Sequence, residues 1–386
     1  MTALDQTSGT DDAALALLIA RFQALPKPKP SAGMEAYDRE LELALSTRSG
    51  CRENYARYLA GARRTDLDYL PIKLDIENVS RCNFRCTMCS VSEWTKGQRA
   101  GDMSLEDFKR VIDEQVGLIE IKLQGLGEPL LQGDTVFEMI RYARSQHIWV
   151  RTTTNASLLH LHDNYKKLVD AGTNEIQISI DGSTEEIFCA IRKGSDFERV
   201  LDNCARINRY CKDLGIKRTK MWSTVQRLNV HQLEDLLELA ARLDFTSVGF
   251  GMDLEAAGLE KWEKQLSGDR VTVDEAFLDR LDRLLRRAGD LDIALGFWKT
   301  FDRFSVKSPE TLCNWPFERS FLSSDMRVVP CCMISNPDVY ELGNVEGAKS
   351  FGDVWHGETY RKFRADHLAG RIPDICASCY KHGETK

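Results

Sequence analysis

The sequence contains the stretch Arg81-Cys82-Asn83-Phe84-Arg85-Cys86-Thr87-Met88-Cys89-Ser90, directly after an apolar run at 70–76. The C-x3-C-x2-C spacing places three thiol groups on one short loop. Thiolates are the ligands of iron–sulfur clusters, whereas a tetrahedral zinc site needs a fourth cysteine or histidine, which this loop does not offer. The stretch therefore predicts a [4Fe–4S] cluster with one iron left open for a small molecule.

The segment that begins at residue 70 alternates between strand-like and helix-like patterns. We expect strands at 72–77, 119–124, 148–153, 175–180, 218–225 and 246–250, and helices at 104–116, 134–147, 161–171, 196–214 and 231–243. Strands separated by helices of this length form a parallel sheet with right-handed crossovers. The pattern predicts an α/β fold, a partial (β/α)6 barrel, with functional residues at the carboxyl ends of its strands.

The cysteine loop and the strand ends that follow it resemble the radical S-adenosylmethionine (SAM) superfamily. The resemblance implies that Cys82, Cys86 and Cys89 hold a [4Fe–4S] cluster whose open iron chelates SAM. Electron transfer then cleaves SAM to methionine and a 5′-deoxyadenosyl radical, which takes a hydrogen atom from the substrate. A flavodoxin- or ferredoxin-type electron donor is also implied.

Several strand-end residues resemble the family's SAM contacts. Gly125-Leu126-Gly127-Glu128-Pro129 resembles its Gly-Gly-Glu-Pro motif, in which glycine exposes the backbone and a carboxylate complements the SAM ammonium group. The resemblance implies SAM contacts at Met88, Gly125, Gly127, Glu128, Pro129, Asn155, Ser179, Asp181 and Arg192. Two alternatives stay open: Met88 also fits simple packing, and Asp181 also fits the N-cap of a following helix.

The last part of the chain is rich in cysteine and resembles the SPASM/twitch extensions of radical SAM enzymes. The resemblance implies an auxiliary [4Fe–4S] cluster held by Cys313, Cys331, Cys376 and Cys379. Cys332 is the spare thiol, because adjacent thiols do not easily reach one cubane. It is either inert or a catalytic hydrogen donor. A structural zinc ribbon is the alternative for this region.

The length, charge and composition of the chain limit the class of protein and its location. The chain has 386 residues and a formal net charge of -7, which gives no reason to expect binding to nucleic acid or an anionic membrane. No apolar run approaches the roughly 18–20 residues of a membrane span, and the N-terminus lacks a signal-peptide pattern, so we expect a cytoplasmic protein. The expected domains are a helical extension (1–69), the barrel (70–250), a connecting segment (251–312) and a small α+β auxiliary-cluster domain (313–386).

The sequence leaves the substrate open. The first hypothesis is a radical SAM oxidoreductase or epimerase that acts on a small polar molecule, such as a sugar, aminocyclitol or nucleoside-type natural-product intermediate. The alternative is radical modification of a ribosomally made peptide by crosslinking, thioether formation or epimerisation. It ranks second because residues 1–69 show no alternating strand pattern for a peptide-binding platform. A non-catalytic cluster scaffold ranks last, since all the expected SAM-contact motifs are present.

Overall fold

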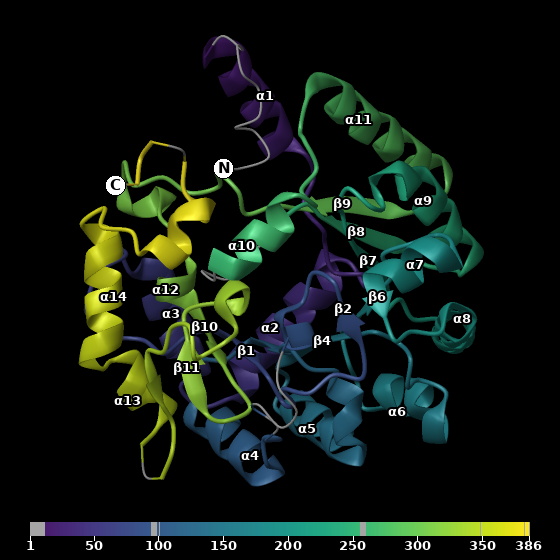
Figure 1. Ribbon diagram of the computed structural model, residues 1–386. Helices are drawn as coiled ribbons and strands as arrows, with labels where there is room; N and C mark the ends of the chain where they lie inside the picture. The colour runs from purple at the N-terminus through teal and green to yellow at the C-terminus, as the bar shows by residue number, and fades with distance from the viewer. Residues whose placement is uncertain are drawn as a thin grey trace.

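One ten-stranded sheet forms the centre of the computed structural model, which describes residues 12–93, 99, 101–254, 260–347, 349–381 and 383–385 (Figure 1). The strand order is β12-β11-β10-β1-β3-β4-β5-β7-β8-β9. All strands from β10 to β9 run parallel, whereas β11 and β12 are added by antiparallel pairing. The strands are β1 (Lys73–Ile76), β3 (Glu120–Leu123), β4 (Trp149–Thr154), β5 (Glu175–Ser179), β7 (Thr219–Thr224), β8 (Ser247–Gly251), β9 (Ala294–Trp298), β10 (Arg319–Leu322), β11 (Arg327–Val329) and β12 (Gly343–Asn344).

Helices cross from one parallel strand to the next and cover the outer face of the sheet (Figure 1). They are α4 (Leu105–Glu114), α5 (Asp134–Ser145), α6 (Asn164–Asp170), α7 (Glu185–Ile191), α8 (Phe197–Asp213), α9 (Leu233–Arg242) and α11 (Glu275–Asp290). Apolar residues that alternate along the strands, such as Leu74, Ile121 and Val150, form one core with these helices. The predicted α/β fold class is confirmed, and β9 adds a further parallel strand.

The cysteine-rich C-terminal region shares this sheet and core. Strand β10 pairs in parallel with β1, on the side of β1 opposite β3. The helices α12 (Trp315–Glu318), α13 (Phe351–Trp355) and α14 (Glu358–Leu368) pack beside it. Arg364 lies buried over the rings of Trp355 and Tyr360, at 4.2 and 4.4 Å from their centroids. The domain boundaries expected from the sequence stay a prediction.

The N-terminal segment closes the far edge and the amino-terminal end of the barrel. It contains α1 (Asp12–Ala24), α2 (Met34–Thr47) and α3 (Cys51–Ala60). Helix α1 lies beside α11, where Arg21 forms ion pairs with Glu275, Asp279 and Asp282 at 2.7, 2.6 and 2.5 Å (Figure 1). The Phe297 N–H of β9 donates to the Pro26 carbonyl at 2.7 Å, so the edge of β9 is covered by the chain itself.

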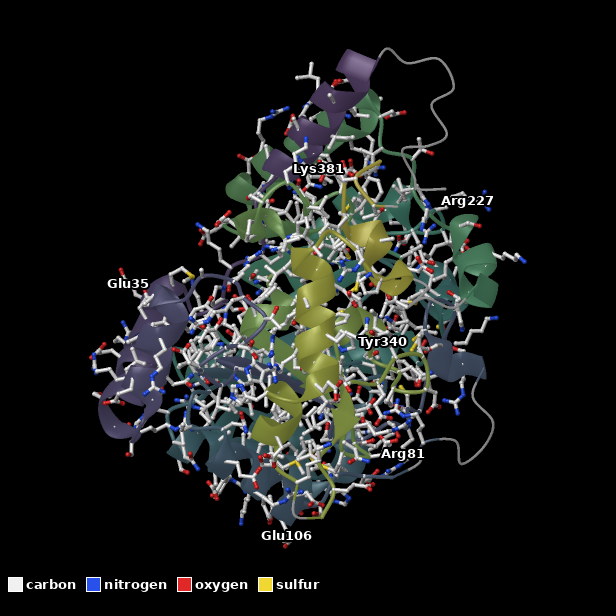
Figure 2. The ribbon with its side chains drawn as sticks, turned by 90° about the vertical axis from the view of Figure 1, so that its left-hand side faces the viewer. Glu35, Arg81, Glu106, Arg227, Tyr340 and Lys381 are labelled. Atoms are coloured by element: carbon white, nitrogen blue, oxygen red, sulfur yellow. The ribbon has the colours of Figure 1, made fainter. Side chains whose placement is uncertain are left out.

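The two ends of the barrel are clearly separated in space. Glu35, on α2, lies at one side of the molecule and Arg81, which begins the cysteine loop, lies at the opposite side (Figure 2). Between β8 and β9, the short helix α10 (Glu260–Ser267) packs Trp262 and Leu266 with Leu254 against Met88 of the cysteine loop. Among the described residues, no helix is long and apolar enough to cross a membrane.

The close approach of the N-terminal segment to β9 yields a first prediction. A Cβ at Gly296 would lie 2.5 Å from the Pro28 backbone nitrogen, so Gly296→Ala should displace this segment and cost about 1–3 kcal/mol of stability. Gly289→Ala is the matched control, because a Cβ there meets no atom within 4 Å. Thermal unfolding of the two cluster-loaded variants checks this; equal midpoints would show that the segment is not held against β9.

Candidate active site

A small two-stranded ribbon holds the first cysteine loop at the mouth of the barrel. Strand β2 (Arg85–Cys86) pairs antiparallel with β6 (Arg192–Lys193), so Cys86 lies opposite Arg192. The Thr87 N–H donates to the Ile191 carbonyl at 2.9 Å, which extends this pairing. The Cys89 N–H donates to the Cys86 carbonyl at 3.1 Å and turns the loop back on itself. The backbone therefore gathers the predicted ligands on a fixed loop.

The loop thiols have the environment of cluster ligands. Burial raises the pKa of Cys82 to about 12 and that of Cys89 to about 11. Repulsion between the neighbouring thiolates also raises these pKa values. Burial also raises the pKa of Cys86, although Arg192 opposes this, with its Nη1 atom 3.9 Å from the Cys86 sulfur. Grouped thiols that bind protons this tightly are stabilised as thiolates by a metal. The donor set thus fits an iron–sulfur cluster.

Two predicted SAM contacts form a buried ion pair behind this loop. Arg192 lies 2.7 Å from Asp181, whose side chain has no exposed surface. The other Asp181 oxygen accepts a hydrogen bond from the Thr224 N–H at 2.7 Å, and burial raises the Asp181 pKa. Asp181 is therefore not a helix cap; the α7 N-cap is Thr184. Ser179 is the buried last residue of β5, two residues before Asp181.

Glu128 ties two strand ends together. Its carboxylate accepts hydrogen bonds from the Thr154 hydroxyl at 2.6 Å and the Asn155 N–H at 2.7 Å, and burial raises its pKa to about 7. Asn155 in turn directs its amide nitrogen to the Cys82 sulfur at 3.9 Å. Pro129 follows as the first residue of a short 3-10 helix, Pro129–Gln132. In this structure Glu128 positions Asn155 toward the cysteine loop.

The glycines of the same motif permit close backbone packing. A Cβ at Gly127 would lie 2.1 Å from the Val79 carbonyl oxygen and 2.6 Å from that of Arg81. A Cβ at Gly125 would lie 2.2 Å from the Glu77 side chain. The sequence predicted that these glycines approach SAM. That role stays a prediction, and the packing that the structure shows is of this loop on the segment leading into Cys82.

Sequence reasoning missed Glu77. This fully buried carboxylate at the end of β1 accepts hydrogen bonds from the Leu126 N–H at 2.9 Å and the Ser324 hydroxyl at 3.2 Å, and it pairs with Arg99 at 2.6 Å. It thereby joins the glycine loop to the turn between β10 and β11. The continued alternation of acidic Asp75 and Glu77 with apolar Leu74 and Ile76 was the available signal.

A cavity of about 320 Å³ opens between the cysteine loop and the C-terminal region. Its walls are formed by residues from the cysteine loop, the ends of β3 and β7, the segment around α10, and the turn after β11. They are Met88, Cys89, Ser90, Gln124, Leu126, Thr224, Asp253, Leu254, Trp262, Cys332, Met333, Ser335 and Asn336. Cys89 and Cys332 thus line the same space, although they are far apart in the sequence.

The C-terminal cysteines divide into two environments. Burial raises the pKa of Cys331 well above its usual value, and the other nearby cysteines add to this effect. The backbone N–H of Cys313 donates to the Tyr380 hydroxyl at 3.0 Å. Tyr380 also interacts electrostatically with Cys376 and Cys379. The structure thus gathers the four predicted auxiliary ligands. Across the described residues, no group of three or more Cys, His, Asp or Glu has the arrangement of a single-ion site.

Cys332 faces the barrel interior. Burial raises its pKa to about 12, and Asp75 of β1 and Lys122 of β3 act on it electrostatically. The backbone of Cys331 is extended, with φ −164° and ψ 171°, and successive side chains of extended backbone point in opposite directions. One thiol of the doublet therefore lies with the other C-terminal cysteines and the next one lies in the cavity.

Comparison with known protein families identifies the two cysteine-bearing regions. The model of the radical SAM superfamily matches residues 76–240, and that of an iron–sulfur cluster-binding domain, SPASM, matches residues 313–380. The chain belongs to the radical SAM superfamily. The predicted cofactors, SAM and [4Fe–4S] clusters in both regions, are thereby confirmed. The assignment of individual site residues stays a prediction.

Relatives of this radical SAM protein match it over most of its length. It is 26% identical to the PqqA peptide cyclase of Rhodopseudomonas palustris over 324 residues, which are 80% of this chain and 79% of the relative. It is 27% identical to mycofactocin maturase MftC of Mycolicibacterium smegmatis, over 80% of this chain and 75% of the relative. Streptococcus suis SuiB bound to SAM has the same fold, with a TM-score of 0.64, 14% identity, and coverage of 87% of this chain and 81% of SuiB.

The packing at Gly127 yields a second prediction. Gly127→Ala should push the cysteine loop away from β3, because the new methyl group would meet two backbone carbonyls. Reconstituted wild-type protein should hold about eight irons, and this variant about four, because only the auxiliary cluster would form. Gly101→Ala, where a Cβ meets nothing within 4 Å, is the control. Unchanged iron content in Gly127→Ala would contradict the packing argument.

Proposed function

We propose that this radical SAM enzyme modifies a ribosomally made peptide, by crosslinking, thioether formation or epimerisation. One observation carries the proposal: a PqqA peptide cyclase and a mycofactocin maturase each match four-fifths of the chain. SuiB, which shares the fold, is also known in complex with its precursor peptide SuiA. These relatives favour the peptide alternative over the small polar substrate that the sequence placed first.

The site residues take the following parts in this proposal. Cys82, Cys86 and Cys89 hold the first cluster, and Cys313, Cys331, Cys376 and Cys379 hold the auxiliary cluster. The first cluster and SAM, when bound, supply a radical that abstracts hydrogen. Met88 and the strand-end motifs enclose SAM, while Arg192 and Asn155 direct donors at the cysteine sulfurs. A flavodoxin- or ferredoxin-type protein supplies the electrons.

Cys332 is the hydrogen donor in the epimerisation form of the proposal. It lines the cavity that Cys89 also lines, so its thiol can reach a substrate carbon bound in that cavity. The substrate radical would accept a hydrogen atom from the thiol, and the resulting thiyl radical would need one electron and one proton from the external reductant. In a crosslinking reaction the substrate radical takes back no hydrogen atom, and the auxiliary cluster would accept one electron from it.

A small polar metabolite is the second candidate. The cavity volume of about 320 Å³ is at the lower end for ligand sites, which suits a compact molecule or one amino-acid side chain. Within residues 12–72, the described N-terminal segment is helical and contains no strand that could pair with a peptide. Dehydrogenation or epimerisation would then be the outcome.

Product analysis tests the proposed function. The cluster-loaded protein is incubated anaerobically with SAM and dithionite in deuterated water, with candidate precursor peptides encoded beside its gene and with sugars and aminocyclitols as a parallel set. We expect 5′-deoxyadenosine together with a modified peptide. Loss of two hydrogens indicates crosslinking, and gain of one deuterium indicates epimerisation. Modification of the small molecules alone would overturn the peptide proposal.

A variant of the spare cysteine separates the two outcomes. Cys332→Ala should keep 5′-deoxyadenosine formation and abolish deuterium incorporation, because the donor thiol is gone while the cluster ligands remain. Cys204→Ala, which removes a buried thiol on α8 far from the cysteine motifs in sequence, is the control for cysteine loss. Unchanged deuterium incorporation in Cys332→Ala would clear Cys332 of the donor role.

A further inference from the structure

The inner face of the partial barrel carries a layer of paired charges near its amino-terminal end. Glu120 of β3 pairs with Lys73 and Arg151, at 3.2 Å in both cases. Glu175 of β5 pairs with Arg151 at 3.0 Å and with Lys220 at 2.8 Å. The Tyr37 hydroxyl of α2 also donates to Glu120, at 3.0 Å. These charges satisfy one another, as buried ions must.

One residue of this charged face differs from the others. Lys122 of β3 lies in register between Asp75 of β1 and Arg151 of β4, and Cys332 lies near enough to interact with it electrostatically. Lys73, Arg151, Lys220 and Arg319 each lie within 4 Å of a carboxylate. Lys122 has no carboxylate within this distance in the part of the chain that the structure describes. Burial and the nearby Arg151 lower the Lys122 pKa to about 8, which leaves the ammonium group charged at neutral pH.

Lys122 lies on the same face of β3 as a residue that lines the cavity. It precedes Gln124 by two residues, so both side chains leave β3 on the same face, and Gln124 lines the cavity. Cys332, which acts on Lys122 electrostatically, also lines it. The Lys122 side chain is only half-buried, in contrast to the apolar residues on either side of it. Its ammonium group is thus a cation on the face that borders the cavity, with no carboxylate within 4 Å among the described residues, and Asp75 is the carboxylate whose charge acts on it most.

We propose that Lys122 binds a carboxylate of the substrate peptide on the side of the cavity that Gln124 lines. The inference rests on the proposed function and narrows it to peptides that present an anion beside the residue to be modified. The carboxylate is either an Asp or Glu side chain or the free C-terminus. A partly desolvated cation gains more from such a partner than an exposed one, because water competes less.

Lysine footprinting of the cluster-loaded enzyme tests the site without turnover. The protein is acetylated briefly with an amine-specific reagent, and labelling of each lysine is measured by mass spectrometry. Glutarate should slow labelling of Lys122 severalfold, whereas the neutral analogue glutaramide should not. Lys217, an exposed lysine between α8 and β7, is the internal control. Equal labelling with both compounds would overturn the inference, and protection by SAM alone would assign the anion to the cofactor instead.

A peptide library tests the substrate class. Random peptides with free or amidated C-termini are passed over the immobilised holoenzyme with SAM, and retained sequences are compared for wild type, Lys122→Met, Lys122→Glu and the control Lys217→Met. We expect acidic sequences or free C-termini to be enriched about tenfold or more by wild type and Lys217→Met only. Lys122→Glu should prefer basic sequences. Dependence on the free C-terminus separates the two carboxylate sources.

The outcomes distinguish this inference from the proposed function. The role of Lys122 would be overturned, and peptide modification kept, if the enzyme modified peptides without any preference for acidic sequences. The same holds if Lys122→Met kept the preference of the wild type. If glutarate protected Lys122 but the enzyme modified no peptide, the carboxylate site would be kept and the proposed function overturned.

Discussion

The parallel pairing of β10 with β1 is the constraint on which the site depends. The Ile72 N–H donates to the Glu318 carbonyl, and the Glu77 N–H donates to the Leu322 carbonyl, at 2.9 and 2.8 Å. Strand β1 leads directly into the first cysteine loop, and β10 leads through a hairpin to the Cys331-Cys332 doublet. The hairpin reverses the chain direction, so the doublet returns alongside β10, whereas the first cysteine loop continues beyond the carboxyl end of β1; Cys89 and Cys332 nevertheless line one cavity. A separately tethered C-terminal domain could not fix Cys332 against the cavity in this way.

The same constraint explains why Glu77 and the glycine motif matter. Glu77 sits where β1 ends and receives hydrogen bonds from the loop after β3 and from the turn after β10. Gly127 lets the first of these loops reach the backbone at Val79. Because the buried Glu77 carboxylate accepts hydrogen bonds from both loops, moving either loop would remove part of its hydrogen bonding in the interior, at a cost of about 1–3 kcal/mol. The relative position of the two cysteine regions is thus enforced twice.

The sequence was sufficient for the elements whose patterns are local. The expected strands and crossover helices appear within a few residues of their predicted bounds, because period-two and helical patterns fix them. Features that depend on distant partners were missed. The ribbon of β2 and β6 has two residues in each strand, and α7 has only seven residues, too few for a periodic pattern. The covering of β9 by Pro26 is likewise a contact between segments far apart in sequence. Substrate class was not decided by local patterns either, and the comparisons favour the alternative that the sequence placed second.

The charged inner face shows why pattern alone misleads here. The alternation Lys73-Leu74-Asp75-Ile76 resembles a strand with one face on the core and the other in water. In the partial barrel, the polar face instead turns toward an enclosed interior, where charges are costly unless they are paired. Apolar side chains of similar volume would often be as stable or more so, and hence stability alone does not account for keeping five cations and their carboxylates there. A row of charges in which one lysine, Lys122, has no carboxylate within 4 Å among the described residues would give such an interior a cation for an incoming anion.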